Sequence, residues 1–271
     1  MPRSRILLVR RGGLGDTLLM LPLLRALRRA HPGRELHFAG VREYTDVACA
    51  FGACDRALST ESLPRWTAAS VRDRLGDYEL IVGDDPAVAR IVIDPRRVAP
   101  AVSFGLQLVR QVGLEPRWPD DSWLQAPRAG RAHGGPLVFA PGSGGRSKCW
   151  PRERWLELAA QVTAAELQIL VGPTELERDD PRGWRWPRPV TFVVGLTPLE
   201  LAGRLAAARA YVGNDSGTTH LAACLGVPTV AVFGATDPAI WAPVGPHVRV
   251  AGRAGREISA VSAEQVGALL D

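Results

Sequence analysis

Two segments of the sequence begin alike, and this repetition restricts the fold more than any other feature. In each, a short apolar run enters a glycine-bearing loop and then a helical stretch, over residues 6–29 and again over 137–162. Such strand–loop–helix segments open doubly wound α/β domains. The first helix is expected over 16–29, starting at Asp16, and the second over 151–162. We therefore expect two α/β domains.

Apolar runs continue to alternate with helical stretches after each opening segment. Short apolar runs between helices indicate parallel sheets with helices on both faces. The runs expected to form strands are 36–39, 80–82 and 91–93 in the first half, and 167–171, 191–194, 210–212 and 229–233 in the second.

The stretch 126–136 (APRAGRAHGGP) has no apolar periodicity and is rich in Gly, Pro and Arg, which favours a linker. We thus expect an N-terminal domain over residues 1–128 and a C-terminal domain over 137–271. A final helix over 262–270 could pack on either domain.

The composition is that of a soluble protein with a sizeable core, because 46% of the residues are hydrophobic and 23% are charged. A formal net charge of +5 suits anionic partners, but the arginines are scattered and form no stripe typical of nucleic-acid binding. Four cysteines show no CxxC or metal-ligand spacing, which favours reduced thiols. No signal peptide or membrane span is recognised. We expect a cytoplasmic monomer and leave peripheral contact with the inner membrane open.

A single lysine, Lys148, stands in the second glycine loop, PGSGGRSKCWP over 141–151. Lysine places a compact charge that suits a diphosphate, and the arginines used elsewhere in the chain do not replace it at a tight anion site. The loop lacks GxxxxGK[ST], which disfavours ATP hydrolysis, and the first loop lacks GxGxxG, which argues against a nicotinamide dehydrogenase. The alternative for Lys148 is an ordinary surface cation.

A further polar segment, GNDSGTTH over 213–220, follows an expected strand and opens an apolar helix. The free N–H groups and the dipole at such a helix start favour an anion, typically a phosphate. Ser216, Thr218 and Thr219 add hydroxyl groups. The alternative is a helix that Asp215 caps, with no ligand.

These segments resemble glycosyltransferase family 9, the bacterial heptosyltransferase family that builds the lipopolysaccharide inner core. Residues 6–22 (ILLVRRGGLGDTLLMLP) resemble its opening strand, glycine loop and Gly-Asp helix start. Residues 142–151 resemble its Lys-x-Trp-Pro loop, and 213–233 (GNDSGTTHLAACLGVPTVAVF) resemble its Asp-(Ser/Thr)-Gly…His segment. The stretch 195–201 resembles the part that precedes this segment.

The resemblance implies a GT-B fold, in which two Rossmann-like doubly wound domains face a cleft. The N-terminal domain would bind the acceptor, on the side of Gly13 and Gly15, and the C-terminal domain would bind a nucleotide-sugar donor, with no cofactor. Glu175 would hold the ribose, with Glu177 as its rival, and Leu196 would lie near the base. The residues implied to bind the donor are Ser143, Gly144, Lys148, Glu175, Leu196, Asp215, Ser216, Gly217 and His220.

Asp16 is the candidate catalytic base that the resemblance implies. Displacing a nucleoside diphosphate from a sugar needs a base for the acceptor proton and positive groups for the leaving diphosphate. Asp16 and Lys148 would fill these catalytic roles. No Asp-x-Asp pair occurs in the sequence, so no metal site is expected. The alternative for Asp16 is a simple helix N-cap.

The leading interpretation is a metal-independent inverting glycosyltransferase. It would move a sugar, with heptose as the favoured one, from an ADP-sugar or related donor to an acceptor hydroxyl. The acceptor is left open between the lipopolysaccharide core, another lipid-linked glycan and a small soluble molecule. Two other classes also stay open: a nucleotide-sugar epimerase on the same fold, and a non-catalytic subunit that binds nucleotide sugars.

Overall fold

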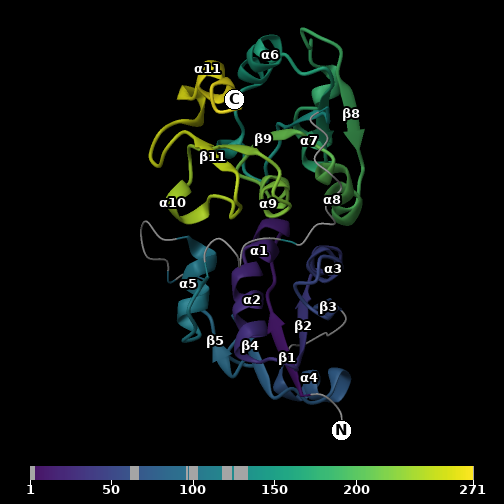
Figure 1. Ribbon diagram of the computed structural model, residues 1–271, viewed down its shortest axis with the longest axis vertical. Helices are drawn as coiled ribbons and strands as arrows, with labels where there is room; N and C mark the ends of the chain where they lie inside the picture. The colour runs from purple at the N-terminus through teal and green to yellow at the C-terminus, as the bar shows by residue number, and fades with distance from the viewer. Residues whose placement is uncertain are drawn as a thin grey trace. The chain divides into compact units, whose positions relative to one another are not determined.

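The computed structural model describes residues 4–61, 67–95, 97, 103–117, 124 and 134–270. The chain forms two compact units, Met1–Gln125 and Ala126–Asp271. Each unit contains one sheet of parallel strands with helices packed against it (Figure 1). The predicted α/β class is therefore confirmed. Most of the predicted linker at 126–136 lies outside the described residues.

The first unit has a five-stranded sheet in the order β3-β2-β1-β4-β5. Its strands are β1 (Arg5–Val9), β2 (Glu35–Gly40), β3 (Arg56–Ser59), β4 (Leu80–Gly83) and β5 (Ile91–Val92). Its helices, within the described residues, are α1 (Leu14–Leu18), α2 (Leu21–Ala30), α3 (Arg42–Ala50), α4 (Ala68–Leu75) and α5 (Phe104–Gln111).

Strand β1 lies in the middle of this sheet and pairs with β2 on one side and β4 on the other. The chain thus winds first toward β3 and then, from β4 on, in the opposite direction. At such a reversal the loops that follow the two central strands leave on opposite faces, and ligands of doubly wound sheets bind there. The reversal places the loops after β1 and β4 at the first unit's candidate ligand edge.

The continuous helix predicted over 16–29 is wrong, because the structure divides this segment into α1 and α2. Pro22 occupies the first turn of α2. A proline has no N–H to donate to the carbonyl of Leu18, four residues earlier, so the helical hydrogen bonds cannot continue through this position. The first helix therefore ends at Leu18, and α2 begins again at Leu21.

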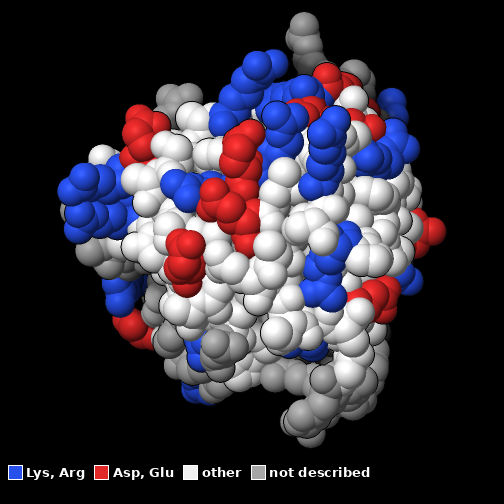
Figure 2. All heavy atoms as spheres, turned by 90° about the horizontal axis from the view of Figure 1, so that it is seen from above, with Lys and Arg blue, Asp and Glu red and all other residues white. Residues whose placement is uncertain are grey.

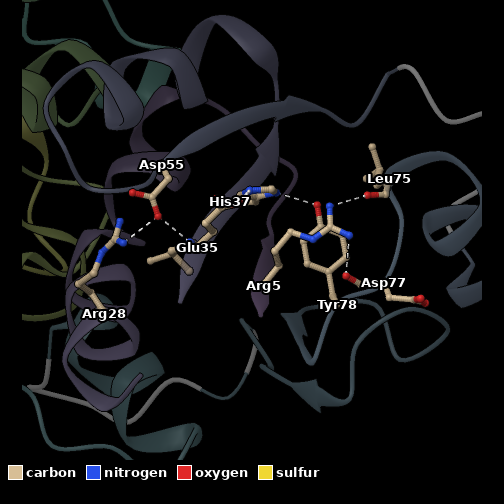
Figure 3. A network of polar contacts seen from close by, with 9 residues as sticks. Arg5, Arg28, Glu35, His37, Asp55, Leu75, Asp77 and Tyr78 are labelled. Atoms are coloured by element: carbon tan, nitrogen blue, oxygen red, sulfur yellow. Dashed lines mark hydrogen bonds and ion pairs between the residues drawn. The ribbon is translucent and has the colours of Figure 1, made fainter. Parts of the chain in front are cut away.

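A polar network joins the amino ends of the central strands (Figure 3). Arg5 donates to the carbonyl oxygens of Leu75 at 3.2 Å and Asp77 at 2.9 Å. Its guanidinium lies 5.0 Å from the ring centre of Tyr78. The Tyr78 hydroxyl in turn lies 2.8 Å from Nδ1 of His37, a residue only 3% exposed. The network ties the start of β1 to the segment that leads into β4.

The second unit has a six-stranded sheet in the order β11-β10-β9-β6-β7-β8. Its strands are β6 (Leu137–Ala140), β7 (Leu167–Val171), β8 (Thr191–Val194), β9 (Ala210–Asn214), β10 (Thr229–Val232) and β11 (Val248–Ala251). Its α-helices are α6 (Arg152–Gln161), α7 (Pro173–Arg178), α8 (Pro198–Ala206), α9 (Gly217–Cys224), α10 (Pro238–Trp241) and α11 (Ala263–Gly267), with short 3-10 turns η2 (Arg146–Lys148), η3 (Pro181–Gly183) and η4 (Ile258–Ala260).

Two strands, β3 and β11, were not anticipated. Both lie at the edge of a sheet. Their sequences, RALS and VRVA, each contain an arginine, and half or more of their residues are not fully buried. An edge strand pairs on one side only and tolerates such polar residues, whereas the edge strands β5 and β8 have the apolar runs that were predicted. The final helix α11 packs against α6 within the second unit (Figure 1).

Tryptophans fill the core of the second unit beneath α6. Trp155 is fully buried, and its ring centre lies 5.0 Å from that of Trp150 and 5.4 Å from that of Phe139. Trp150 is 2% exposed, and its indole N–H donates to the carbonyl of Val261 at 2.9 Å. Because Trp150 ends the glycine loop, this packing anchors that loop to the core.

The buried imidazole of His37 predicts a pH-dependent stability of the first unit. Burial lowers the pKa of His37 below 6.5, although Glu35 opposes the shift. The unfolded chain therefore takes up a proton at a higher pH than the folded one. The neutral imidazole favours the folded state above about pH 6.5, and this contribution to the free energy of unfolding is lost as the pH falls. Urea unfolding should show less loss of stability from about pH 7.5 to 5.5 in His37→Asn than in the wild type. Equal losses in both proteins would contradict this assignment.

Candidate functional site

The reversal of strand order in the second sheet lies between β6 and β9. Strand β6 pairs with β7 on one side and with β9 on the other. The loops that follow β6 and β9 therefore start side by side at the carboxyl edge of the sheet, where doubly wound folds bind their ligands. These are the two segments that the sequence singled out, the loop 141–151 and the stretch 213–220.

Asn214, the last residue of β9, joins the two loops. Its side chain is fully buried and donates to the carbonyl of Pro141 at 2.6 Å, while its Oδ1 accepts from the amide of Trp150 at 3.1 Å. Ser143 adds a second tie, since its hydroxyl donates to the carbonyl of Asp215 at 2.7 Å. Both ends of the glycine loop are thereby fixed to the end of β9.

Lys148 forms an ion pair with Asp215, whose Oδ2 lies 2.6 Å from Nζ. The Asp215 side chain is 9% exposed and that of Lys148 is 33% exposed. The same Oδ2 accepts a hydrogen bond of 2.7 Å from the hydroxyl of Thr236. Thr236 follows β10, the next strand in the sheet, and sequence reasoning did not identify it. Its place just after an apolar strand was the available signal.

Ser216 is the N-cap of α9, so the alternative in which Asp215 caps this helix is wrong. The Asp215 carboxylate instead binds Lys148 and Thr236. The amides of Thr219 and His220 bond to the Ser216 carbonyl. The earlier amides of a helix have no partner within it and carry a partial positive charge. Asp215, which binds Lys148, directly precedes this helix start. We call Ser143, Gly144, Lys148, Asp215, Ser216 and Gly217, where the sequence predicts a bound anion, the anion site.

The hydroxyl groups near this helix start are only partly available to a ligand. Thr219, predicted to add a hydroxyl group here, is fully buried and donates this hydroxyl to the carbonyl of Asn214. Thr218 and Ser216 are partly exposed and lie 3.0 Å apart at their hydroxyl oxygens. The Tyr211 hydroxyl lies 2.8 Å from that of Thr218, and burial raises the pKa of Tyr211 to about 12. The hydroxyl groups of Tyr211, Ser216 and Thr218 thus contact one another at the start of α9.

Glu175 lies beside the glycine loop, whereas its rival Glu177 is exposed. Oε2 of Glu175 accepts from the Gly172 amide at 2.8 Å. Its Oε1 occupies the position of a side chain at Gly142, where a Cβ would come within 1.2 Å. A pocket lies between the loop and α7, lined by Pro141, Gly142, Ser143, Cys149, Trp150, Arg152, Thr174, Glu175, Arg178, Asp179, Pro181 and Trp184.

Arg178 contacts the glycine loop at Ser143 and Gly144. Sequence reasoning did not identify this residue. One of its guanidinium nitrogens donates to the carbonyl oxygens of Ser143 at 3.2 Å and Gly144 at 3.0 Å. A side chain at Gly144 would meet open space, since no atom lies within 4 Å of its Cβ position. The loop is thus exposed at Gly144, where Arg178 of α7 holds its backbone.

Two further residues predicted to bind the nucleotide-sugar donor are Leu196, which is exposed, and His220, which is buried. Leu196 is 39% exposed and follows the edge strand β8. It is at the carboxyl edge of the sheet but does not line the described pocket. His220 is 5% exposed in the first turn of α9. Of the residues predicted to bind the donor, the structure brings Lys148 and Asp215 into direct contact.

Asp16 lies at the reversal of the first sheet, and it is not the N-cap of α1. The N-cap is Gly13, whose amide donates to Oδ2 of Asp16 at 3.0 Å, so Asp16 stands three residues further on. The backbone of Gly12 has φ +145, and a Cβ there would meet the Asp16 side chain at 2.7 Å. Gly15 lies inside α1. Gly12 therefore leaves room for the Asp16 carboxylate, which the Gly13 amide holds.

Arg10 joins Asp16 to a second carboxylate, that of Asp84. Its two terminal nitrogens lie 2.8 Å from Oδ1 of Asp16 and 2.6 Å from Oδ2 of Asp84. Arg10 follows β1 and Asp84 follows β4, the two strands at the reversal. The planar fork of arginine suits two acceptors at once. Sequence reasoning missed both residues, although each directly follows an apolar run.

Charged side chains of both signs are interspersed on the face drawn in Figure 2, and no uniformly basic area covers it. Among the described residues, no group of three or more His, Cys, Asp and Glu side chains could hold a metal ion. Within the same ranges no helix is long and apolar enough to cross a membrane.

Replacement of Asn214 should loosen the anion site. In Asn214→Asp, the carboxylate can accept from Trp150 but cannot donate to Pro141, and a buried carbonyl loses its partner. We expect a loss of about 1–3 kcal/mol in the stability of the second unit, the cost of an unsatisfied buried group. Urea unfolding measures this change, and Glu257→Gln, an acid-to-amide exchange at an exposed position before η4, is the control. Equal stability of Asn214→Asp and the control would contradict the bridging role.

A family model and curated relatives both match this chain to heptosyltransferases. The family model "Glycosyltransferase family 9 (heptosyltransferase)" matches residues 100–266. Lipopolysaccharide heptosyltransferase 1 of Pseudomonas aeruginosa is 28% identical over 284 residues, covering 86% of this chain and 79% of that protein. Lipopolysaccharide heptosyltransferase 1 of Escherichia coli K12 is 32% identical over 123 residues, covering 44% of this chain and 38% of that protein.

Solved structures show the same architecture. A glycosyltransferase of family 9 from Veillonella parvula has a TM-score of 0.77 at 18% identity, covering 98% of this chain and 97% of that one. The E. coli heptosyltransferase WaaC with ADP has a TM-score of 0.75 at 20% identity, covering 98% and 99%. These likenesses place the fold in the GT-B class. Together with the family match over more than half of its length, they show that the chain belongs to glycosyltransferase family 9, the heptosyltransferase family.

Proposed function

We propose that this glycosyltransferase moves a heptose from an ADP-linked donor to an acceptor hydroxyl, with inversion at the anomeric carbon and without a divalent ion or other cofactor. The observation that carries the proposal is the pairing of Lys148 with Asp215 at the start of α9. The family and the heptosyltransferase relatives support the sugar. Solved structures titled heptosyltransferase WaaC with ADP, or with ADP-2-deoxy-2-fluoro heptose, support the nucleotide.

The anion site supplies what a departing diphosphate needs. Negative charge grows on the diphosphate as the bond to the sugar breaks, and preorganised positive groups stabilise that change. The ammonium of Lys148, which Asp215 holds, and the first amides of α9 are such groups. A divalent ion would serve the same purpose in other transferases. We therefore propose that Lys148 and the helix start take its place here.

Glu175 is the residue we propose for the ribose. Its carboxylate stands against Gly142 at the pocket beside the anion site and can accept from two neighbouring hydroxyls. Leu196 stays a proposal for contact with the base, and His220 for the sugar-diphosphate. In the first unit, Asp16 is the proposed base, with Gly13 and Gly15 on the acceptor side. A single displacement assisted by one base inverts the anomeric centre.

The acceptor that we propose is a sugar of the lipopolysaccharide core. The curated relatives named above are lipopolysaccharide heptosyltransferases, which supports this class over a small soluble acceptor. A cytoplasmic monomer that contacts the inner membrane only at its periphery would fit such an acceptor. The epimerase and the non-catalytic subunit receive no support from these relatives.

Removal of the Lys148 ammonium should weaken ADP binding about tenfold or more, as expected for a lost charge-assisted contact of about 1.5–3 kcal/mol. Calorimetry of ADP binding to Lys148→Met measures this effect. Arg146→Met is the matched control, because it removes an exposed positive charge two residues earlier. The wild type should also prefer ADP to UDP, GDP, CDP and dTDP.

Unchanged ADP affinity in Lys148→Met would remove this residue from the site. A preference for another nucleotide would overturn the ADP-linked donor while leaving the fold assignment intact.

Replacement of the Asp16 carboxylate should abolish transfer and spare donor binding. A positioned general base contributes about 10²- to 10⁴-fold to a rate, so Asp16→Asn should lose turnover on that scale. The assay follows ADP release from ADP-heptose with heptose-deficient lipopolysaccharide in buffer containing EDTA, because the proposed reaction needs no divalent ion. Asp46→Asn on α3 is the control. Turnover that survives in Asp16→Asn would leave this residue a structural role only.

A further inference from the structure

The loop after β10 contributes a hydroxyl group to the anion site. Thr236 donates to Oδ2 of Asp215 at 2.7 Å, and Nζ of Lys148 lies 2.6 Å from that same oxygen. The two donors come from loops that follow different strands, β10 and β6, and Asp215 follows β9, which lies between them. Three neighbouring loops thus meet at one carboxylate oxygen.

The position of Thr236 is fixed on both sides. Two residues earlier, a Cβ on Gly234 would come within 2.6 Å of the backbone nitrogen of Ile258, so the loop presses closely against η4. One residue later, Asp237 caps α10 by accepting from the amide of Ala239. The backbone around Thr236 is therefore held by the fold and does not depend on the contact with Asp215.

The Asp215 carboxylate creates an electrostatic difficulty at this place. It directly precedes Ser216, the N-cap of the helix whose first amides attract an anion. An unneutralised carboxylate there would repel a diphosphate. Because both donors bind Oδ2, they fix the orientation of the carboxylate and draw its charge toward Lys148 and Thr236.

We propose that Thr236 is a positioning residue for the donor diphosphate. Its hydroxyl holds Asp215, and Asp215 in turn holds the Lys148 ammonium beside the start of α9. Thr236 acts through Lys148 and does not itself touch the ligand. This inference rests on the proposed function, since it presumes that Lys148 contacts the diphosphate of ADP.

A double-mutant cycle with ADP as the probe tests this chain of contacts. Thr236→Val removes the hydroxyl and keeps the branched shape, and calorimetry should show ADP affinity reduced about three- to tenfold, the scale of one hydrogen bond. Thr236→Ser should restore most of the affinity. In the Lys148→Met background, Thr236→Val should cause no further loss, because residues that act as a unit are not additive. Thr163→Val, an exposed threonine beyond α6, is the control.

Each departure from these results has a distinct meaning. If Lys148→Met weakens ADP binding while Thr236→Val binds like the wild type, the positioning role is overturned and the proposed function stands. If the two losses add independently, Thr236 acts directly or through the fold, which also overturns the role. If the wild type does not bind ADP, the proposed function fails and this inference fails with it. Melting temperatures of all variants identify any loss that arises from unfolding.

Discussion

The two hydrogen bonds of the buried Asn214 side chain are the contacts on which the carboxyl edge of the second sheet depends. The reversal of strand order sends the loops after β6 and β9 to opposite faces, so nothing in the sheet itself fixes one loop against the other. The amide of Asn214 does so, because a single planar group donates to Pro141 and accepts from Trp150. A carboxylate or an aliphatic side chain of the same size could supply at most one of these bonds. The geometry of Lys148 and Asp215 follows from this tie.

The two units use their basic residues differently at corresponding places. In the first unit, Arg10 spans two carboxylates with its planar fork and is committed to both. In the second unit, Lys148 meets one carboxylate and keeps a third of its side chain exposed. An ammonium has three donors, so it can hold Asp215 and still bind an anion. This contrast gives a physical reason for the only lysine in a chain that otherwise relies on arginine.

Prediction from sequence succeeded where a signal is local and failed where a contact is not. Apolar periodicity identified the central strands, such as β1 and β9, because both of their faces are buried. It missed the edge strands β3 and β11, each of which contains an arginine, and found the edge strands β5 and β8, which contain none. The lysine and the helix start were recognisable as chemistry. Their partner Thr236 was not, since it is brought to Asp215 from 21 residues away by the pairing of β9 with β10.

Helix caps show the same limit at shorter range. An acidic residue before a helix predicts a cap, yet Asp215 binds side chains from two other loops and leaves the cap to Ser216. Asp16 likewise lies three residues beyond the cap at Gly13. Local propensity names the residues that a helix start can use, and tertiary contacts decide which of them it does use.

The carboxylate of Glu175 occupies the space that a side chain at position 142 would fill. A side chain at position 142 would therefore displace the Glu175 carboxylate from its present place. Such a substitution would also move the group proposed for the ribose. The lack of one carbon atom at Gly142 thus decides where a carboxylate 33 residues further along the chain can lie.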